Sequence, residues 1–423
     1  MSNSSATLDM LGRARLTSVA SARAQLLSQI SDCQPQSEAL PLAECLDRIC
    51  ASQVVAPEDL PPTERSTMDG FAVVAADTFG ASQSMPGYLE IKGEVIMGES
   101  PQGRISRGTC FKIPTGGILP EGADAVVMHE HTVPVDGKVI EIIKPVGSGT
   151  NLIRKGDDIG KGGVALERGR VLRPQELGLL AGLGITEVEV FKPLTVAIIS
   201  TGDEIIDYRE PVRPGKIRNI NSIVLGSHVL RCGAQVSDYG IVSDDESSFF
   251  STVEKAVAQT DLVLFSGGSS VGMRDLGEQA IERIGNPGIL VHGVSLKPGK
   301  PVIIGLCNKT PVFGLPGHPV SAMVCFDFFV KPAIDILSGR SSEETNIQAS
   351  VKARLKRNIN SAAGRLDVIR VELSYESDEL QAKPILGKSG AISTLSKAHG
   401  YFLIAEDCQG VNIDEIVEVY LYQ

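Results

Sequence analysis

The chain of 423 residues is long enough for about three domains and buries enough apolar surface to need neither disulfides nor structural metals. Hydrophobic residues make up 42% and charged residues 22%, the balance of a folded globular protein rather than a disordered one. The 40 lysines and arginines against 51 aspartates and glutamates give a net charge of −11, which argues against a nucleic-acid-binding protein. An anionic ligand would therefore require a local concentration of positive charge.

The cysteine and hydropathy patterns bear on the compartment. The eight cysteines are scattered, with no CxxC pair and no Cys/His cluster at zinc spacing, so we expect reduced, mostly buried thiols. No apolar run approaches the roughly 20 residues of a membrane span. The first 31 residues contain one acid, Asp9, as transit peptides tend to, but apolar residues from Leu16 to Ile30 recur at helical spacing and predict a helix of the folded protein. We expect a cytoplasmic protein without membrane contact.

The organisation changes several times along the chain. A helical stretch runs to about residue 48, and residues 49–148 are rich in Gly, Pro and short β-type runs, which predicts a small β-rich unit. Residues 149–190 are mixed, with a helix expected at 174–183 that stops at Gly184.

From 194 to 338, strands alternate with helices. We expect strands at 195–199, 235–242, 261–265, 302–306 and 312–315, and helices at 221–231, 247–257, 276–284 and 320–337. This alternation predicts a parallel sheet covered on both faces. After Gly339, period-two alternation predicts an all-β module in the last 80 or so residues.

Polar loops shaped by Gly, Pro or Ser follow four predicted strands of the α/β region, and a fifth, 296–301, ends another extended segment. The loops are 200–204, 243–246, 266–272, 296–301 and 314–319. One such loop would be read as an ordinary turn, but ligands of open parallel sheets bind at the carboxyl ends of the strands. Five loops at that edge therefore predict a binding site.

The residue types in two of these loops indicate an anionic ligand. A Gly/Ser run before a helix offers free backbone N–H groups suited to phosphate. Its candidate binding residues are Gly267, Gly268, Ser269 and Ser270. Lys297 and Lys300 flank a Pro-Gly turn, so both ammonium groups could meet one anion.

Three carboxylates follow three different strand ends: Glu204, Asp244 and Asp275. Each alone could be a helix cap or a solvated loop charge. Together they would repel one another, and a divalent cation such as Mg²⁺ bridging them to a phosphate would neutralise them. These three are the candidate metal ligands.

One other motif has a competing interpretation. Residues 268–272 satisfy the GxSxG pattern of a serine-hydrolase elbow, which needs Asp and His partners later in the chain. A histidine within hydrogen-bond reach of Ser270 would favour that alternative.

Several long motifs, in one order over nearly the whole chain, resemble those of the molybdopterin molybdenumtransferases, which complete molybdenum-cofactor assembly and are related to the C-terminal domain of gephyrin. The motifs are 66–72 (STMDGFA), 114–117 (PTGG), 120–127 (PEGADAVV), 200–204 (STGDE), 266–272 (SGGSSVG), 297–301 (KPGKP) and 314–321 (GLPGHPVS).

The resemblance implies a multidomain α/β plus β fold. Its parts would be a discontinuous mixed N-terminal domain (1–48 and 149–190), a β-rich insertion domain (49–148), a three-layer α/β molybdopterin-binding domain (191–340) and a C-terminal β-barrel-like domain (341–423). It also implies an elongated homodimer whose site is shared between the α/β domain of one subunit and the insertion of the other. An upstream molybdopterin adenylyltransferase and downstream molybdoenzymes are the expected partner enzymes.

The implied reaction inserts molybdenum from molybdate into adenylylated molybdopterin and releases AMP, with Mg²⁺ as the cofactor. Carried over by position, the site residues are Asp69, Thr115, Glu204, Asp244, Asp275, Lys297, Lys300, Arg365 and Ser389. Asp69 and Thr115 would close the site from the partner subunit, while Arg365 and Ser389 would reach in from the last domain. The acids at these positions argue against the alternative of a non-catalytic scaffold or pterin-binding protein of the same fold.

This chain departs from the resemblance at two positions. Gly293 stands where many members have Lys, and His318 stands where many have Asn. We interpret His318 as a packed loop residue rather than a ligand. Both changes affect the expected anion contacts, and tungstate remains an alternative to molybdate because the two oxyanions have similar size and charge.

Overall fold

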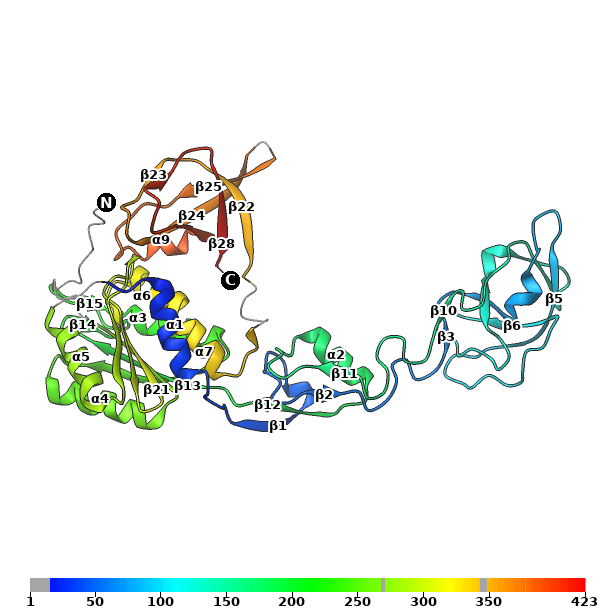
Figure 1. Ribbon diagram of the computed structural model, residues 1–423, viewed down its shortest axis with the longest axis horizontal. Coiled ribbons are helices and arrows are strands. Elements are labelled where there is room, and N and C mark those ends of the chain that lie inside the picture. Colours follow the sequence, from blue (N-terminus) through cyan, green and yellow to red (C-terminus); the bar gives the residue numbers. More distant parts are fainter. Residues whose placement is uncertain (1–15, 268–270, 343–347, 377, 423) are drawn as a thin grey trace, which may run out of the picture.

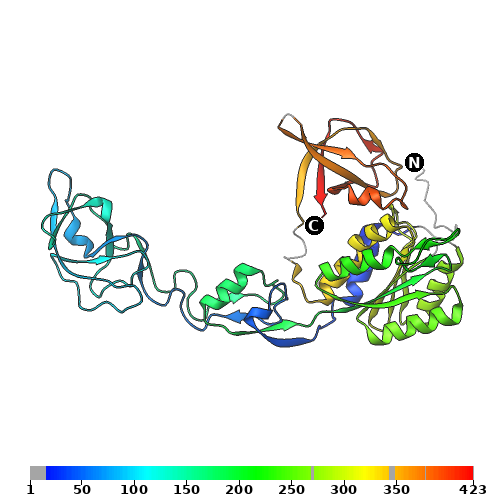
Figure 2. The ribbon, with the colours of Figure 1, turned by 180° about the vertical axis from the view of Figure 1, so that it is seen from behind.

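The computed structural model describes residues 16–267, 271–342, 348–376 and 378–422, except for the side chains of 271–274. The molecule is elongated (Figures 1 and 2). An α/β layer and a C-terminal barrel lie together at one end, a small module follows, and a β-rich unit lies at the other end. None of the described helices is long and apolar enough to cross a membrane.

The α/β layer is a six-stranded sheet with helices on both faces (Figure 1). In spatial order its strands are β16 (Gln235–Val242), β13 (Thr195–Thr201), β17 (Leu262–Gly267), β21 (Thr310–Pro316), β20 (Ile303–Cys307) and β18 (Gly288–His292). One face packs against α1 (Val19–Ile30), α3 (Asn221–Arg231), α6 (Pro319–Cys325) and α7 (Lys331–Leu337); the other packs against α4 (Glu246–Gln259) and α5 (Val271–Ile284). Alternate residues of β13 supply the two hydrophobic cores, because successive side chains of a strand point to opposite faces.

The sheet is mixed, so the prediction of a wholly parallel sheet was wrong at one edge. β16, β13, β17 and β21 are parallel, but β20 runs antiparallel to β21, and β18 antiparallel to β20. Only Asn308 and Lys309 join β20 to β21, and a parallel pairing needs a crossover of about a dozen residues or more. A two-residue connection forces a hairpin.

The first and last helices of this layer pack together. The apolar face of α1 shares the core that contains α7, although the segment 1–48 is predicted to belong to the discontinuous domain. The helix expected at 320–337 is present but not uniform, because the π-helical segment η4 (Phe326–Val330) separates α6 from α7.

The small module brings together segments that are far apart in sequence. β1 (Ser37–Pro41) pairs with β12 (Glu187–Phe191), and β2 (Val54–Val55) pairs with β11 (Val164–Leu166), all antiparallel. The segments before and after the β-rich unit therefore lie side by side, as a discontinuous domain requires. The exact domain boundaries stay a prediction.

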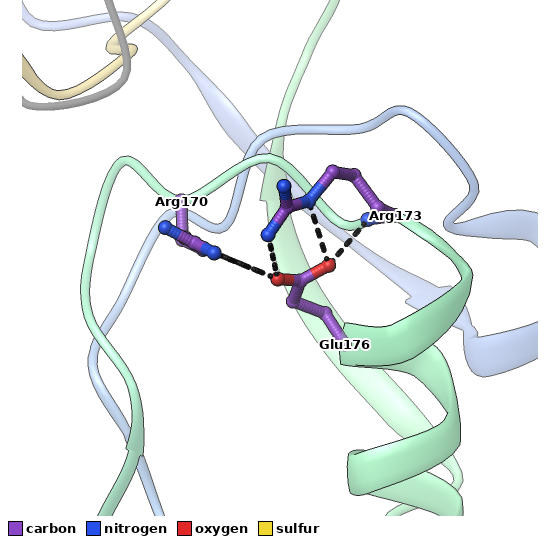
Figure 3. A network of polar contacts seen from close by, with 3 residues as sticks. All are labelled: Arg170, Arg173 and Glu176. Atoms are coloured by element: carbon purple, nitrogen blue, oxygen red, sulfur yellow. Dashed lines mark hydrogen bonds and ion pairs between the residues drawn. The ribbon is translucent and has the colours of Figure 1, made fainter. Parts of the chain in front are cut away.

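The small module contains a polar network of Glu176 with Arg170 and Arg173 (Figure 3). Glu176 lies in the first turn of α2 (Pro174–Gly182) and accepts the backbone N–H of Arg173 at 3.1 Å, which caps the helix. Its carboxylate also accepts hydrogen bonds from the guanidinium groups of Arg170, at 2.9 Å, and Arg173, at 2.6 Å. Burial alone would raise the pKa of Glu176, but these hydrogen bonds outweigh it and hold the pKa at about 2.

The β-rich unit contains a six-stranded sheet in the order β7-β4-β6-β5-β9-β8. The strands are β4 (Gly70–Val73), β5 (Gly87–Glu94), β6 (Thr109–Ile113), β7 (Ala125–Met128), β8 (Thr132–Pro134) and β9 (Val139–Ile142). β3 (Arg65–Ser66) pairs with β10 (Leu152–Ile153) where the chain enters and leaves this unit.

The C-terminal module is a closed barrel, as predicted. β24 (Leu366–Glu376), β25 (Glu379–Pro384), β22 (Ser350–Leu355), β28 (Ile416–Leu421) and β26 (Gly400–Ile404) pair in that order, and a β24–β26 pairing closes the ring. The short strand β19 (Leu296–Lys297), which comes from the α/β layer, pairs in parallel with β24. The barrel is thus joined to the strand-end loops of the layer.

Candidate functional site

A cavity of about 780 Å³ lies between the carboxyl ends of the α/β strands and the barrel. Thr201, Gly267 and Pro316, the last residues of β13, β17 and β21, contribute to its wall. The loops 294–301 and 314–318 complete the α/β side, and residues 365–370 and 385–389 supply the barrel side. The predicted edge of the sheet therefore does carry a cavity, and the barrel forms its second wall.

The β19–β24 pairing determines how the first lysine lies. Lys297 is the register partner of Asp367, and its Nζ is 3.5 Å from Asp367 Oδ2. Arg365 donates to the same carboxylate through Nε, at 2.8 Å to Oδ1. Asp367 is only 1% exposed, whereas the lysine and arginine side chains are partly exposed in the cavity wall. One buried acid therefore positions two cations.

The cavity is basic although the protein is acidic. Among the described residues, the charged side chains of its wall are Lys297, Lys300, Arg365, Arg370 and Lys388, with Asp367 as the single acid. This is the local concentration of positive charge that an anionic ligand requires in a protein of net charge −11. Of the predicted site residues, Gly267, Lys297, Lys300, Arg365 and Ser389 lie together in this wall.

Gly267 has a steric reason to be glycine. A β-carbon built on it would lie 1.6 Å from the hydroxyl oxygen of Thr201, on the neighbouring strand. The ends of β13 and β17 can approach closely only because no side chain separates them. Gly268, Ser269 and Ser270 lie outside the described residues. The serine-hydrolase alternative depends on a histidine near Ser270, so the structure does not test it.

Two of the predicted acids, Glu204 and Asp244, lie close to each other next to the end of β13. The backbone N–H of Asp244 donates to Asp203 Oδ1 at 3.3 Å, and Asp244 Oδ1 is buried without a hydrogen-bond partner among the described residues. Burial, together with the charges of Asp203 and Glu204, raises the pKa of the Asp244 carboxyl. Asp275 lies on α5, the helix that follows β17.

The chemistry of these acids suits a divalent cation, but their arrangement in the described part of the chain does not complete a metal site. The unbonded Asp244 oxygen, near the charges of Asp203 and Glu204, is a hard, negative oxygen of the kind that Mg²⁺ prefers. Within the described residues, however, no three His, Cys, Asp or Glu side chains are arranged closely enough to hold a metal ion. Asp203 was missed by the sequence analysis; its position directly before Glu204 in a strand-end loop was the available signal.

Asp69 and Thr115 lie at the far end of the molecule, in the β-rich unit (Figure 1). Asp69 Oδ1 accepts the backbone N–H of Thr115 at 2.7 Å, and the hydrogen bonds from Thr115 lower the pKa of this carboxyl. The exposed apolar residues Met68, Ile96 and Met97 belong to the same unit, Met68 next to Asp69 in sequence. Within one chain, this pair does not reach the cavity.

The two departures noted in the sequence have different structural roles. Gly293 has φ of +81°, a backbone conformation that a lysine would adopt only with strain, so the chain at this position is built for glycine. His318 lines the cavity, and its Nδ1 lies 2.9 Å from Ser389 Oγ on the barrel side.

Arg370 is a wall residue that the sequence analysis missed. It is 6% exposed, its Nε has no hydrogen-bond partner among the described residues, and burial lowers its pKa. No acid pairs with it in the described part of the chain. A buried cation at a cavity wall without an acidic partner favours an anionic ligand. The sequence did contain a signal for this position. Val368 and Arg370 are two residues apart on β24, so they lie on the same face of the strand.

Comparisons with known proteins define the class. The MoeA N-terminal region (domains I and II) matches residues 17–184, the "probable molybdopterin binding domain" family matches 197–335, and the MoeA C-terminal region (domain IV) matches 352–422. The three matches follow the order of the modules described above. The fold and the matches together define a multidomain protein of molybdopterin biosynthesis.

Individual relatives narrow this to one family. The chain is 33% identical to the molybdopterin molybdenumtransferase of Haemophilus influenzae, over 94% of this chain and 96% of that protein. It is 31% identical to the enzyme of the same name from Bacillus subtilis, over 92% and 90%. A crystal structure of the MoeA protein of Pyrococcus horikoshii superposes with a TM-score of 0.83 at 35% identity and covers 96% of this chain and all of that one. The chain belongs to the MoeA family of molybdopterin molybdenumtransferases, which confirms the resemblance and the predicted fold class.

Proposed function

We propose that the protein inserts molybdenum from molybdate into adenylylated molybdopterin and releases AMP, giving the molybdenum cofactor. The observation that carries the proposal is the basic cavity between the strand ends and the barrel, in a chain that is acidic as a whole. Both substrates are anionic, and the described wall of the cavity offers five cations against one acid. The family relationship supports the same substrate class.

The two walls would perform different tasks. Where the two walls meet, Arg365 of the barrel side and Lys297 of the α/β side, both held by buried Asp367, would bind an oxyanion, since charge-assisted hydrogen bonds from fixed donors are the stronger ones. On the α/β side, β17 ends at Gly267, where it lies close to Thr201 of β13. The Gly/Ser loop that follows Gly267 in sequence would hold phosphate. Binding both substrates between two walls brings the reacting groups together and excludes water.

Mg²⁺ would be held by Asp244 and Glu204. Asp203 precedes Glu204 in the loop after β13, and Asp275 belongs to α5, the helix after β17. When bound, it would screen the negative charge of the pyrophosphate and act as a Lewis acid. The unbonded Asp244 oxygen is the feature that supports this placement.

The proposal includes a homodimer with shared sites. Asp69 and Thr115 border β4 and β6 of the β-rich unit, which lies at the other end of the molecule from the cavity (Figure 1), and Met68, Ile96 and Met97 of the same unit are exposed. A protein contact would cover such exposed apolar side chains. A second copy is the occupant that would bring this unit to the cavity.

The test is a defined assay with purified protein, adenylylated molybdopterin, molybdate and Mg²⁺. We expect AMP to appear in step with activation of an apo-molybdoenzyme. Arg365→Met should lose both signals, while Arg357→Met, an exposed arginine of the same barrel, should keep them. Binding of the pterin without AMP release would instead favour the non-catalytic scaffold, and Ser-dependent ester hydrolysis would favour the hydrolase.

A further inference from the structure

His318 and Ser389 form a hydrogen bond between the two walls of the cavity. Ser389 Oγ and His318 Nδ1 are 2.9 Å apart, and both residues line the cavity. A second contact joins the same segments, because the backbone N–H of Val320 donates to the Ser389 carbonyl at 3.2 Å. The imidazole edge lies against Gly390, where a built β-carbon would be 3.6 Å from His318 Cδ2. The imidazole is exposed, but these contacts hold the ring next to the serine hydroxyl.

The single proton of the hydroxyl makes the direction of this bond important. If Ser389 donates to Nδ1, its proton is used, and the hydroxyl can only accept further hydrogen bonds. A fully deprotonated oxyanion has only acceptors, so Ser389 in that state has nothing to offer it. If Nδ1 carries the proton and donates to Oγ, the hydroxyl proton is free to point into the cavity.

We infer that His318 is the positioning residue that orients the Ser389 hydroxyl as a donor to the tetrahedral oxyanion, molybdate, in this cavity. This inference rests on the proposed function, whose substrate it uses. His318 would act from the α/β side through a residue of the barrel side, so the oxyanion contact forms only when the two walls are together. Lys297 on the α/β side and Arg365 and Lys388 on the barrel side line the same cavity and would provide the charge.

The alternative is a purely structural histidine that ties two loops together. The backbone bond from Val320 to Ser389 already provides a tie, and it does not depend on the side chain at 318. The two roles differ in which replacement restores binding. An asparagine places an amide N–H near the position of Nδ1, a glutamine places it one bond further, near Nε2, and a leucine has none.

The experiment measures the dissociation constant of molybdate alone for the full-length protein and its variants, with thermal midpoints as folding controls. We expect His318→Leu to weaken binding by about 10-fold or more, since a hydrogen bond to a charged group is lost. His318→Asn should bind close to wild type, and His318→Gln should resemble His318→Leu. If His318→Leu does not fold, the comparison of His318→Asn with His318→Gln still distinguishes the positioning role from the purely structural one.

A double-mutant cycle separates action through Ser389 from independent action. Because His318 acts only by orienting that hydroxyl, His318→Leu combined with Ser389→Ala should bind no more weakly than Ser389→Ala alone. Additive losses, equal binding by the Asn and Gln variants, or wild-type binding by His318→Leu would each overturn the inference. Absence of molybdate binding by the wild type would overturn the proposed function as well, which distinguishes the two failures.

Discussion

Lys297 and Asp367 face each other across the pairing of β19 with β24, with Nζ 3.5 Å from Oδ2. One residue belongs to the KPGKP loop of the α/β layer and the other to the barrel. The ion pair therefore couples the joining of two domains to the placement of a cation in the cavity wall.

Asp367→Ala tests this coupling. The buried carboxylate accepts from Arg365 and Lys297, so its loss should lower the free energy of unfolding by about 1–3 kcal/mol. Turnover should fall further than stability alone explains, since both cations lose their orientation. Chemical denaturation and the AMP-release assay measure the two effects, with Glu372→Ala, an exposed acid of the same strand β24, as a control. Normal turnover by Asp367→Ala would contradict this role.

The paired lysines are expected to contribute directly to anion binding. Replacing Lys297 or Lys300 by Met keeps most of the stem, and each change should weaken binding of adenylylated molybdopterin by roughly 10- to 150-fold. Added salt should weaken the wild type more than either variant, because screening acts on the charges that remain. Titrations at two ionic strengths measure both effects. Unchanged dissociation constants would place the lysines outside the site.

Arg370→Met should separate stability from function. Within the described residues no acid pairs with this buried guanidinium, so an apolar side chain of similar length should leave stability unchanged or raise it by about 1–4 kcal/mol. Anion binding should weaken nevertheless, because the cavity loses a cation. Denaturant midpoints and molybdate titrations on the same preparation test this. Loss of stability with intact binding would make Arg370 a structural residue.

Inactive variants of the two ends of the molecule should complement each other. Asp69→Ala and Asp275→Ala each remove a polar-loop or helix-surface carboxylate, so the stability cost should be small, on the order of 0.5 kcal/mol. Each alone should abolish metal insertion. Mixed subunits should recover part of the activity, because one site in the hybrid dimer then has both intact residues. If verified subunit exchange restores nothing, each site is contained within one chain.

The Glu176 network gives a pH prediction away from the site (Figure 3). The pKa of Glu176 is about 2 in the folded protein, against an ordinary value of 4.5. Its stabilising effect is thus complete above the ordinary value and is lost as the pH falls from there toward 2. At pH 7, Glu176→Gln should lower the free energy of unfolding by on the order of 2–3 kcal/mol.

The difference between Glu176→Gln and wild type should shrink at pH 3. Glu167→Gln, an exposed acid of the same module, is the matched control and should change stability little at either pH. Urea denaturation at the two pH values measures both. A constant difference across this range would mean that the carboxylate charge is not what stabilises the module.

The elements of the α/β layer were largely determined by local sequence pattern. The strand at 235–242 and the helix at 221–231 have the bounds that the periodicity predicts, because an apolar pattern of period two or 3.6 leaves few other ways to bury those side chains. The strand-end loops identified Lys297 and Gly267 for the same local reason. Motif order alone was sufficient to indicate the family.

Only the tertiary structure decided what meets in the cavity. Register in the β19–β24 pair, which no local pattern encodes, sets Asp367 opposite Lys297, and the closed barrel places Ser389 beside His318. His318 was interpreted as a packed loop residue, but a hydrogen-bond partner 71 positions away gives it a place in the cavity wall. Such contacts depend on how separately folded units pack, and the free energy that selects them is spread over many residues rather than written in any one segment.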